Sequence, residues 1–163
     1  MKIYCPNCFY PNDSSKNICE KCGKLLDWKD ESYEDKLIKA LSHKDPRIVL
    51  RAVEILSNFK SYKVEKALVK IIFKTKDPYI QSAAISSLTD IGLPETLKIF
   101  RKLALSGTFP ARIKAIEALG KKSNKKYALN DIDLLEKLKN EKSETIKVKS
   151  EEAILNIKNR NNL

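Results

Sequence analysis

Two similar stretches of this sequence, DPRIVLRAVEIL at 45–56 and DPYIQSAAISSL at 77–88, decide the fold. FPARIKAIEAL at 109–119 and ETIKVKSEEAIL at 144–155 repeat their pattern at a spacing of about 32 residues. The aligned positions hold small residues at Ala52, Ala84, Ala115 and Ser150, and large aliphatic residues at Leu56, Leu88, Leu119 and Ile154. Small residues let two helices approach closely, and the large ones fill the next layer. The pattern predicts helices that stack at a fixed period.

Each repeat begins with residues that favour a helix start. Asp45 and Asp77 can cap helices whose first residues are Pro46 and Pro78. Pro110 has the same role in the third repeat, and Ser143 is the candidate cap of the fourth.

Apolar residues at helical spacing also fill the segments between these repeats. We therefore expect eight helices, at 33–43, 46–58, 62–75, 78–91, 94–106, 110–121, 131–141 and 144–158. Helix pairs at this period stack into an α-solenoid, so the predicted fold is mostly α. An irregular helical bundle is the alternative.

The stretches at 45–56, 77–100 and 111–120 resemble HEAT-like repeats of the short kind. Their shared pattern is Asp-Pro, a Val-Arg step, paired alanines, then leucine and glycine. The Val-Arg step survives in shifted form as Leu50-Arg51, Ala111-Arg112 and Ile146-Lys147. The resemblance covers about 46–158 and implies helical hairpins that present a binding surface.

All four cysteines, Cys5, Cys8, Cys19 and Cys22, lie in the stretch CPNCFYPNDSSKNICEKC at 5–22. Two C-x2-C pairs form two tight turns whose thiolates complete a tetrahedral S4 shell for Zn2+. About 30 residues cannot bury enough apolar surface to fold alone, and one structural zinc supplies what the core lacks. Redox-active C-x2-C pairs, free thiols and rubredoxin-type iron are the alternatives.

The same stretch resembles the short zinc-ribbon modules of many bacterial and archaeal proteins, with a small β-hairpin. The resemblance rests on CPNC, Pro11-Asn12 and CEKCGKLL, where Pro11-Asn12-Asp13 is expected to turn the chain between the two cysteine pairs. Phe9 departs from the family pattern, which usually has glycine there.

The expected organisation is a zinc ribbon at 1–27, a linker at 28–31 and a HEAT-like repeat domain at 32–163. The ribbon, with Trp28 at the junction, is expected either to cover the apolar end of the solenoid or to be flexibly tethered. A solenoid end needs such a cover because it exposes apolar surface.

Charge separates the two parts. Residues 1–31 have no net charge, so residues 32–163 carry the whole +11. Two basic stripes are candidate binding surfaces, one at Lys63, Lys66, Lys70 and Lys74 and the other at Lys98, Arg101 and Lys102. Both helices are expected in the second place of their units, which in HEAT-like proteins lines the concave surface. The sequence thus predicts a basic groove, unless the stripes are only solvated faces.

The sequence favours a non-catalytic scaffold that binds another protein through its helical-repeat surface. Nucleic acid is the alternative partner, although 27 Lys against 5 Arg argues against bidentate phosphate contacts. Catalytic motifs and a small-molecule site are not evident, and four thiolates leave zinc no open position for water. With neither a signal-peptide pattern nor a bilayer-length apolar run, a cytoplasmic protein without a membrane anchor is expected.

Overall fold

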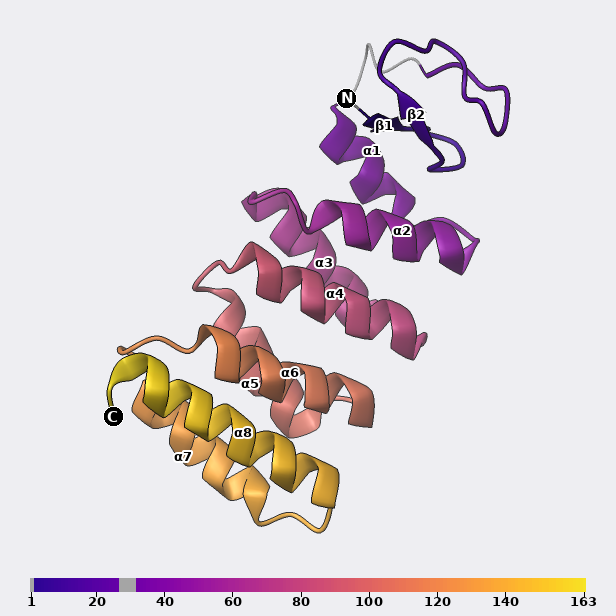
Figure 1. Cartoon of the computed structure of the whole chain (residues 1–163). Coiled ribbons are helices and arrows are strands. Elements are labelled where there is room, and N and C mark those ends of the chain that lie inside the picture. The colour runs from indigo at the N-terminus through magenta and orange to yellow at the C-terminus, as the bar shows by residue number, and fades with distance from the viewer. Residues whose placement is uncertain (1, 27–31) are drawn as a thin grey trace.

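The computed structural model describes residues 2–26 and 32–163. In the second range it contains eight helices: α1 Tyr33–Ala40, α2 Pro46–Leu56, α3 Tyr62–Lys74, α4 Pro78–Ile91, α5 Thr96–Ser106, α6 Phe109–Lys122, α7 Ala128–Lys139 and α8 Glu144–Asn161. The helices follow one another as a stack with the small β region beside α1 (Figure 1). The predicted α-solenoid with an N-terminal β region is confirmed. The predicted linker, with Trp28, falls within 27–31 and lies outside the described residues.

The predicted caps account for where several helices begin. The Asp45 carboxylate accepts a hydrogen bond from the backbone N–H of Arg47 at 2.9 Å, and Asp77 accepts one from Tyr79 at 2.8 Å. Ser143 caps α8 in the same way. Each cap satisfies a backbone donor that the first turn leaves without an intrahelical partner.

The helices form antiparallel hairpins that pair α1 with α2, α3 with α4, α5 with α6 and α7 with α8. The second helices α2, α4, α6 and α8 also pack directly on one another, whereas neighbours among α1, α3, α5 and α7 barely touch. We call these the even row and the odd row. In a curved two-layer stack the inner helices lie closer together, so the even row is the inner layer and the odd row the outer layer.

The expectation that α3 and α5 occupy the second place of their units is therefore wrong. Thr75–Asp77 and Gly107–Thr108 are the short connections that fold α3 back on α4 and α5 back on α6. Both helices come first in their hairpins and belong to the outer layer. The two lysine stripes therefore lie in the outer layer and not on the inner face of the stack.

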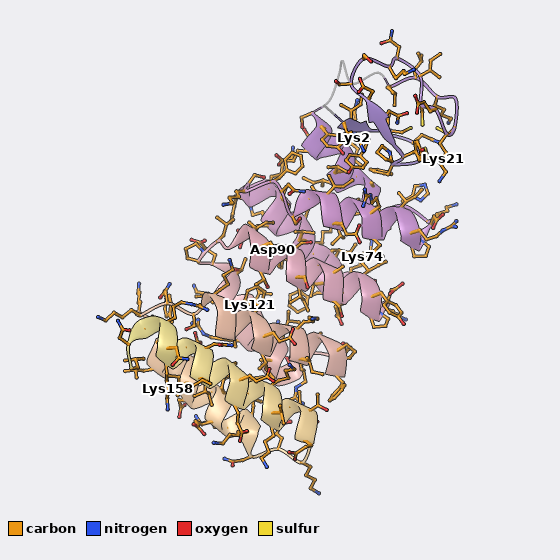
Figure 2. All side chains as sticks on the ribbon, in the orientation of Figure 1. Lys2, Lys21, Lys74, Asp90, Lys121 and Lys158 are labelled. Carbon is orange, nitrogen blue, oxygen red and sulfur yellow. The ribbon has the colours of Figure 1, made fainter. Side chains whose placement is uncertain are left out.

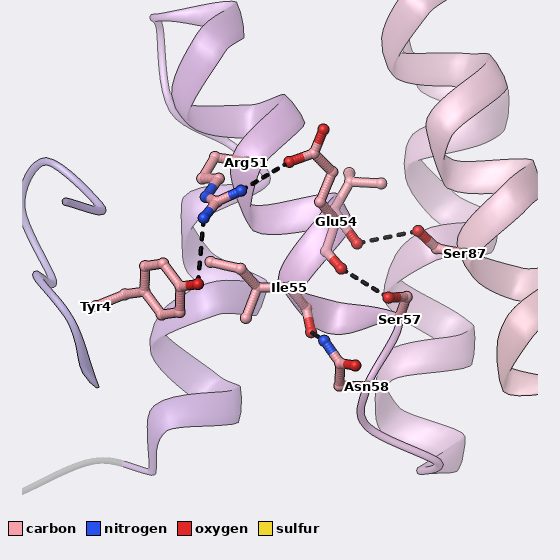
Figure 3. A network of polar contacts seen from close by, with 8 residues as sticks. Tyr4, Arg51, Glu54, Ile55, Ser57, Asn58 and Ser87 are labelled. Carbon is pink, nitrogen blue, oxygen red and sulfur yellow. Dashed lines mark hydrogen bonds and ion pairs between the residues drawn. The ribbon is translucent and has the colours of Figure 1, made fainter. Parts of the chain in front are cut away.

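The repeated small residues allow the close packing of the even row. Ala52, Ala84, Ala115 and Ser150 are all fully buried. At Gly120 a Cβ atom would lie only 3.0 Å from the Cβ of Ala153, so α6 and α8 approach too closely for a side chain there. Ser87 donates a hydrogen bond to the carbonyl of Val53 at 3.1 Å and joins α4 to α2 (Figure 3).

Two short strands form the β region, β1 Lys2–Tyr4 and β2 Pro11–Asp13, which pair antiparallel with Tyr4 opposite Pro11. The expectation that Pro11-Asn12-Asp13 forms a turn is wrong, because these residues pair with β1. The chain turns just after them, where Lys16 donates its backbone N–H to the carbonyl of Asp13.

The β region is docked on the first hairpin. The Phe9 ring is only 5% exposed and belongs to the same buried cluster as Leu37 and Leu56. Tyr4 packs against that cluster and meets Arg51 of α2 (Figure 3). Of the two arrangements expected for the ribbon, the structure has the docked one.

Candidate functional site: a four-cysteine cluster and two exposed surfaces

The four cysteines lie on two turns with matching backbone geometry. The N–H of Phe9 donates to the carbonyl of Cys5, and the N–H of Gly23 donates to the carbonyl of Cys19, each at 2.9 Å. Phe9 and Gly23 both have positive φ, at 55° and 70°. A left-handed residue after the second cysteine of each pair therefore closes each turn and directs its two thiols to one side.

The sulfur atoms are spaced for one tetrahedral metal ion. The Sγ atoms of Cys5 and Cys22 are 3.6 Å apart, as are those of Cys8 and Cys19, and all four lie within 4.8 Å of one another. A tetrahedron with metal–sulfur bonds of about 2.3 Å would place the sulfurs about 3.8 Å apart. The cluster can therefore hold a metal ion.

Two of the four thiols have raised pKa values and two have lowered pKa values. Burial raises the pKa values of Cys5 and Cys8, the latter to about 12. Burial acts in the same direction at Cys19, but backbone N–H groups of Cys22 and Lys21 and the neighbouring thiols outweigh it and lower the pKa to about 6. The pKa of Cys22 is also lowered, first by a backbone N–H group. Thiols this close resist ionising together, so binding a cation releases protons.

Two asparagines donate hydrogen bonds to the sulfur atoms. Asn7 donates its backbone N–H to the Cys5 sulfur at 3.4 Å and its side-chain amide to Cys22 at 3.8 Å. The buried Asn12 amide nitrogen lies 3.7 Å from the Cys19 sulfur, while its oxygen accepts from the backbone of Glu20. Sequence reasoning treated both only as turn residues. Their donors stabilise negative sulfur and orient the thiolates.

The first lysine stripe lies exposed along α3. Lys63 forms an ion pair with Asp35 of α1, and the Lys66 ammonium lies 4.5 Å from the centre of the Tyr62 ring. Lys70 and Lys74 are exposed and have no ionic partner among residues 2–26 and 32–163. Two lysines of the stripe thus have neither an ionic nor an aromatic partner in the described part of the chain, and both lie in the second half of the helix.

The second stripe, on α5, is not uniform. Lys98 and Lys102 are exposed, and Lys102 lies over the Phe73 ring at 5.1 Å. Arg101 instead reaches Asp131 of α7 through Nε at 2.5 Å and Nη2 at 3.2 Å, and its guanidinium lies over Tyr127. The interpretation of Arg101 as a free surface cation is corrected, because its charge is held by a fully buried carboxylate.

Four exposed apolar side chains lie where α3 and α5 end and α4 and α6 begin, at one edge of the stack. Phe73 lies near the end of α3 and Tyr79 at the start of α4, and Leu105 and Phe109 occupy the same places in the next hairpin. Tyr79 is 79% exposed, and the others are 50–58% exposed. In Figure 2, Lys74, the residue after Phe73, is labelled on the side of the stack opposite Asp90 and Lys121. We call these four residues the apolar edge. Sequence reasoning missed it, because the shared edge follows from the hairpin pairing.

Comparisons with known proteins agree with the fold. The family model of HEAT repeats matches residues 34–120, which is more than half of the chain. No curated protein matches the sequence. The crystal structure of an engineered protein from the Northeast Structural Genomics Consortium matches with a TM-score of 0.50 and 21% identity, over 78% of this chain and 63% of that one.

A second engineered protein from the same consortium has a TM-score of 0.49 and 20% identity, over 77% of this chain and 37% of that one. This chain thus spans less than two thirds of either engineered protein. Within the described ranges, none of the helices is long and apolar enough to cross a bilayer.

Proposed function

Because this chain belongs to the HEAT-repeat family, we propose that it is a non-catalytic scaffold that binds a protein partner through the surface of its helical repeats. The apolar edge is the observation that carries this proposal. Exposed aromatic side chains that gather on a surface are typical of protein interfaces, where a few such residues supply most of the binding free energy.

Further support comes from the way the edge is held. The Thr108 hydroxyl donates to the Gln81 side-chain oxygen at 2.6 Å and joins the start of α6 to the start of α4. Gln81 in turn donates to the carbonyl of Ile72 at the end of α3. The ends that carry the four apolar side chains are therefore tied together. A preorganised surface loses less conformational entropy when it binds.

We also propose that the four cysteines bind one Zn2+ with a structural role. Four thiolates and two amide donors suit zinc, and a complete S4 shell leaves no position for water or a substrate. The ion would hold the two turns together and so keep Phe9 and Tyr4 against the helices. Because thiolate ligands persist in a reducing compartment, the proposed location is the cytoplasm.

Affinity capture from extracts of cells that natively produce the protein tests the scaffold. A partner retained by the original chain should be lost with the double variant Tyr79→Glu/Phe109→Glu. The control Leu129→Glu/Leu155→Glu adds the same charge at exposed apolar positions of α7 and α8, and it should retain the partner. A partner kept by the edge variant, or lost equally with the control, would reject the apolar edge as the interface.

Nucleic acid is the second candidate partner, favoured by the net charge of +11 and by the uncompensated Lys70 and Lys74. Fluorescence anisotropy of labelled single-stranded and duplex DNA and RNA, from about 50 to 200 mM salt, separates the two functions. If Lys63, Lys66, Lys70 and Lys74 each neutralise one phosphate, the slope of log K against log salt should be near −3 to −4. An absence of binding at the lowest salt would leave the protein-binding function alone.

A further inference from the structure

A cavity of about 560 Å³ opens between α1, the connection from α1 to α2, the start of α2, the second half of α3 and the start of α4. Binding pockets for compact ligands and side chains are of this size. The floor is apolar and consists of Ile38, Leu41, Val49, Ala67, Ile71 and Ile80. We call this cavity the basic pocket, for the reasons that follow.

The cavity exists because two neighbouring helices of the outer layer differ in length. Helix α1 ends at Ala40 after 8 residues, whereas α3 runs for 13 residues to Lys74. At 1.5 Å per residue, α1 is about 12 Å long and α3 about 20 Å. The last turns of α3 therefore have no helix beside them on the α1 side, and the loop at Ser42–Lys44 frames the open space.

The rim of the pocket is cationic. Lys70 and Lys74 stand one turn apart on α3, and Lys44 faces them from the loop. The Nδ1 atom of His43 accepts the backbone N–H of Asp45 at 2.9 Å, so its Nε2 carries the proton of the neutral ring and can donate. Lys39 lines the rim as well.

One carboxylate lies in the lining. Asp77 accepts backbone hydrogen bonds from Tyr79 and Ile80 as the cap of α4. Its charge is thereby directed to the helix start, so the rim keeps its excess of cations.

We propose that the basic pocket receives a large apolar side chain from an acidic segment of the partner protein, with the carboxylates of that segment pairing with Lys70 and Lys74. This inference rests on the proposed scaffold function and names the chemistry of its partner. The floor requires an apolar group, and the rim requires anions close to it. Phe73 and Tyr79 of the apolar edge directly precede the lining residues Lys74 and Ile80 in the sequence, so the pocket and the edge share the α3–α4 hairpin and one partner can contact both.

The lining favours an acidic peptide over nucleic acid. Among the residues that the structure describes, the lining has aliphatic floor residues and one imidazole at the rim, and no Phe, Tyr or Trp on which a base could stack. An aliphatic floor gains nothing from phosphate, but it gains from burying Phe or Leu.

Two fluorescein-labelled peptides test the proposal, one with four glutamates on each side of a central phenylalanine and one with alanine at the centre. Anisotropy titrations at fixed salt should give a Kd for the phenylalanine peptide that is about ten-fold lower or more, the gain expected from burying one such side chain. Ala67→Phe, which fills the floor without a change of charge, should remove this difference. Ala67→Leu serves as the smaller replacement if the first variant unfolds.

Charge is tested separately. Lys70→Glu/Lys74→Glu should weaken both peptides more than ten-fold. Lys98→Glu/Lys102→Glu has the same spacing and the same charge change outside the pocket, and should weaken both by a smaller factor. Circular dichroism checks that each variant remains helical.

Several results would overturn the inference: no binding of either peptide, equal affinity for the two peptides, or an equal loss of peptide affinity with the two charge-reversed variants. If dodecanoate binds with an affinity that the variants lower, and the peptides do not bind, the pocket would instead be a small-molecule site. If capture of the partner is lost with Tyr79→Glu/Phe109→Glu but unaffected by Lys70→Glu/Lys74→Glu, the scaffold function stands and the pocket inference fails. If both variants still capture the partner, both proposals fail.

Discussion

Arg51 of α2 contacts Tyr4 of β1 in two ways: its guanidinium carbon lies 5.0 Å from the centre of the ring, and its Nη2 donates to the hydroxyl at 3.2 Å (Figure 3). Arg51 also pairs with Glu54 of its own helix. The Val-Arg step of the repeat pattern, shifted here to Leu50-Arg51, thus supplies the cation that holds the β region on the first hairpin.

Removing the metal is expected to destabilise the helices as well as the β region. If the four cysteines hold the proposed zinc, its removal should unfold the β region, so that Phe9 and Tyr4 no longer pack on the buried cluster that contains Leu37. The helical melting temperature, followed by circular dichroism, should fall when a chelator is added. An unchanged melting temperature would contradict the coupling.

A double-mutant cycle isolates the contact itself. Tyr4→Ala and Arg51→Ala should each lower stability, and their coupling free energy should be about 0.5–1 kcal/mol, as for a partly exposed cation–π pair. Chemical denaturation of the zinc-loaded protein and its three variants measures this coupling. Strictly additive effects would show that the contact contributes nothing.

Phe9→Gly is expected to separate metal binding from docking. A left-handed backbone costs a non-glycine residue about 1–2 kcal/mol, so glycine relieves strain in the first turn. The same change removes a ring that is 95% buried, at a cost of about 3 kcal/mol or more. Zinc affinity, measured by competition with a chromophoric chelator, should be kept or increased, while the stability of the helices falls. A fall in both would mean that the ring also supports the metal site.

Asp131 and Asp133 of α7 allow the loss of a buried ion pair to be compared with the loss of an exposed one. Asp131→Ala leaves Arg101 without its buried partner and also removes the acceptor of the Ser123 hydroxyl, so a loss of about 3–5 kcal/mol is expected. Asp133→Ala breaks an exposed pair with Lys137 and should cost less than about 1 kcal/mol. Urea denaturation compares the two, and equal losses would contradict the interpretation of Arg101 as a structural cation.

Glu65 is expected to destabilise the fold at neutral pH. It is only 5% exposed, and its Oε2 has no hydrogen-bond partner in the described part of the chain. Burial, and next the charge of Glu95, raise its pKa, so the folded state holds the proton more tightly than the unfolded state. Stability should therefore rise as the pH is lowered through the raised pKa toward the ordinary pKa of an unfolded glutamate, and it should stay flat above the raised pKa.

Glu65→Gln should add about 1 kcal/mol at pH 7 and reduce this pH dependence. Thermal melts from pH 5 to 8 provide the measurement, and Glu136→Gln on the exposed face of α7 is the control. Equal pH profiles for the original chain and the Glu65 variant would exclude Glu65 as the cause.

Much of the fold could be predicted from the sequence, because its signals are local. Asp45 and Asp77 cap the helices as predicted, and the small residues of each repeat are buried. The prediction of helix ends that lack a local signal was less accurate: α1 ends at Ala40 instead of residue 43, and α7 begins at Ala128 instead of residue 131. The four cysteines were predicted to lie together, and they do.

What could not be predicted depends on contacts between residues that are distant in the sequence. The periodic pattern marks which helices repeat but not which row is inner, so the lysines were assigned to the wrong face. Arg101 resembles its neighbours on the helix until Asp131, thirty residues later, is placed beside it. The basic pocket depends on the early end of α1, which no capping residue in the sequence predicts.

The unequal packing of the two rows has a mechanical consequence. A bend that separates α2, α4, α6 and α8 must open the buried core, whereas a bend that spreads α3 from α5 breaks few contacts. The molecule is therefore stiff in one direction and compliant in the other. The lysine-bearing helices α3 and α5 are thus kept in register by the even row and by the hydrogen bonds of Gln81, and little by contacts with each other.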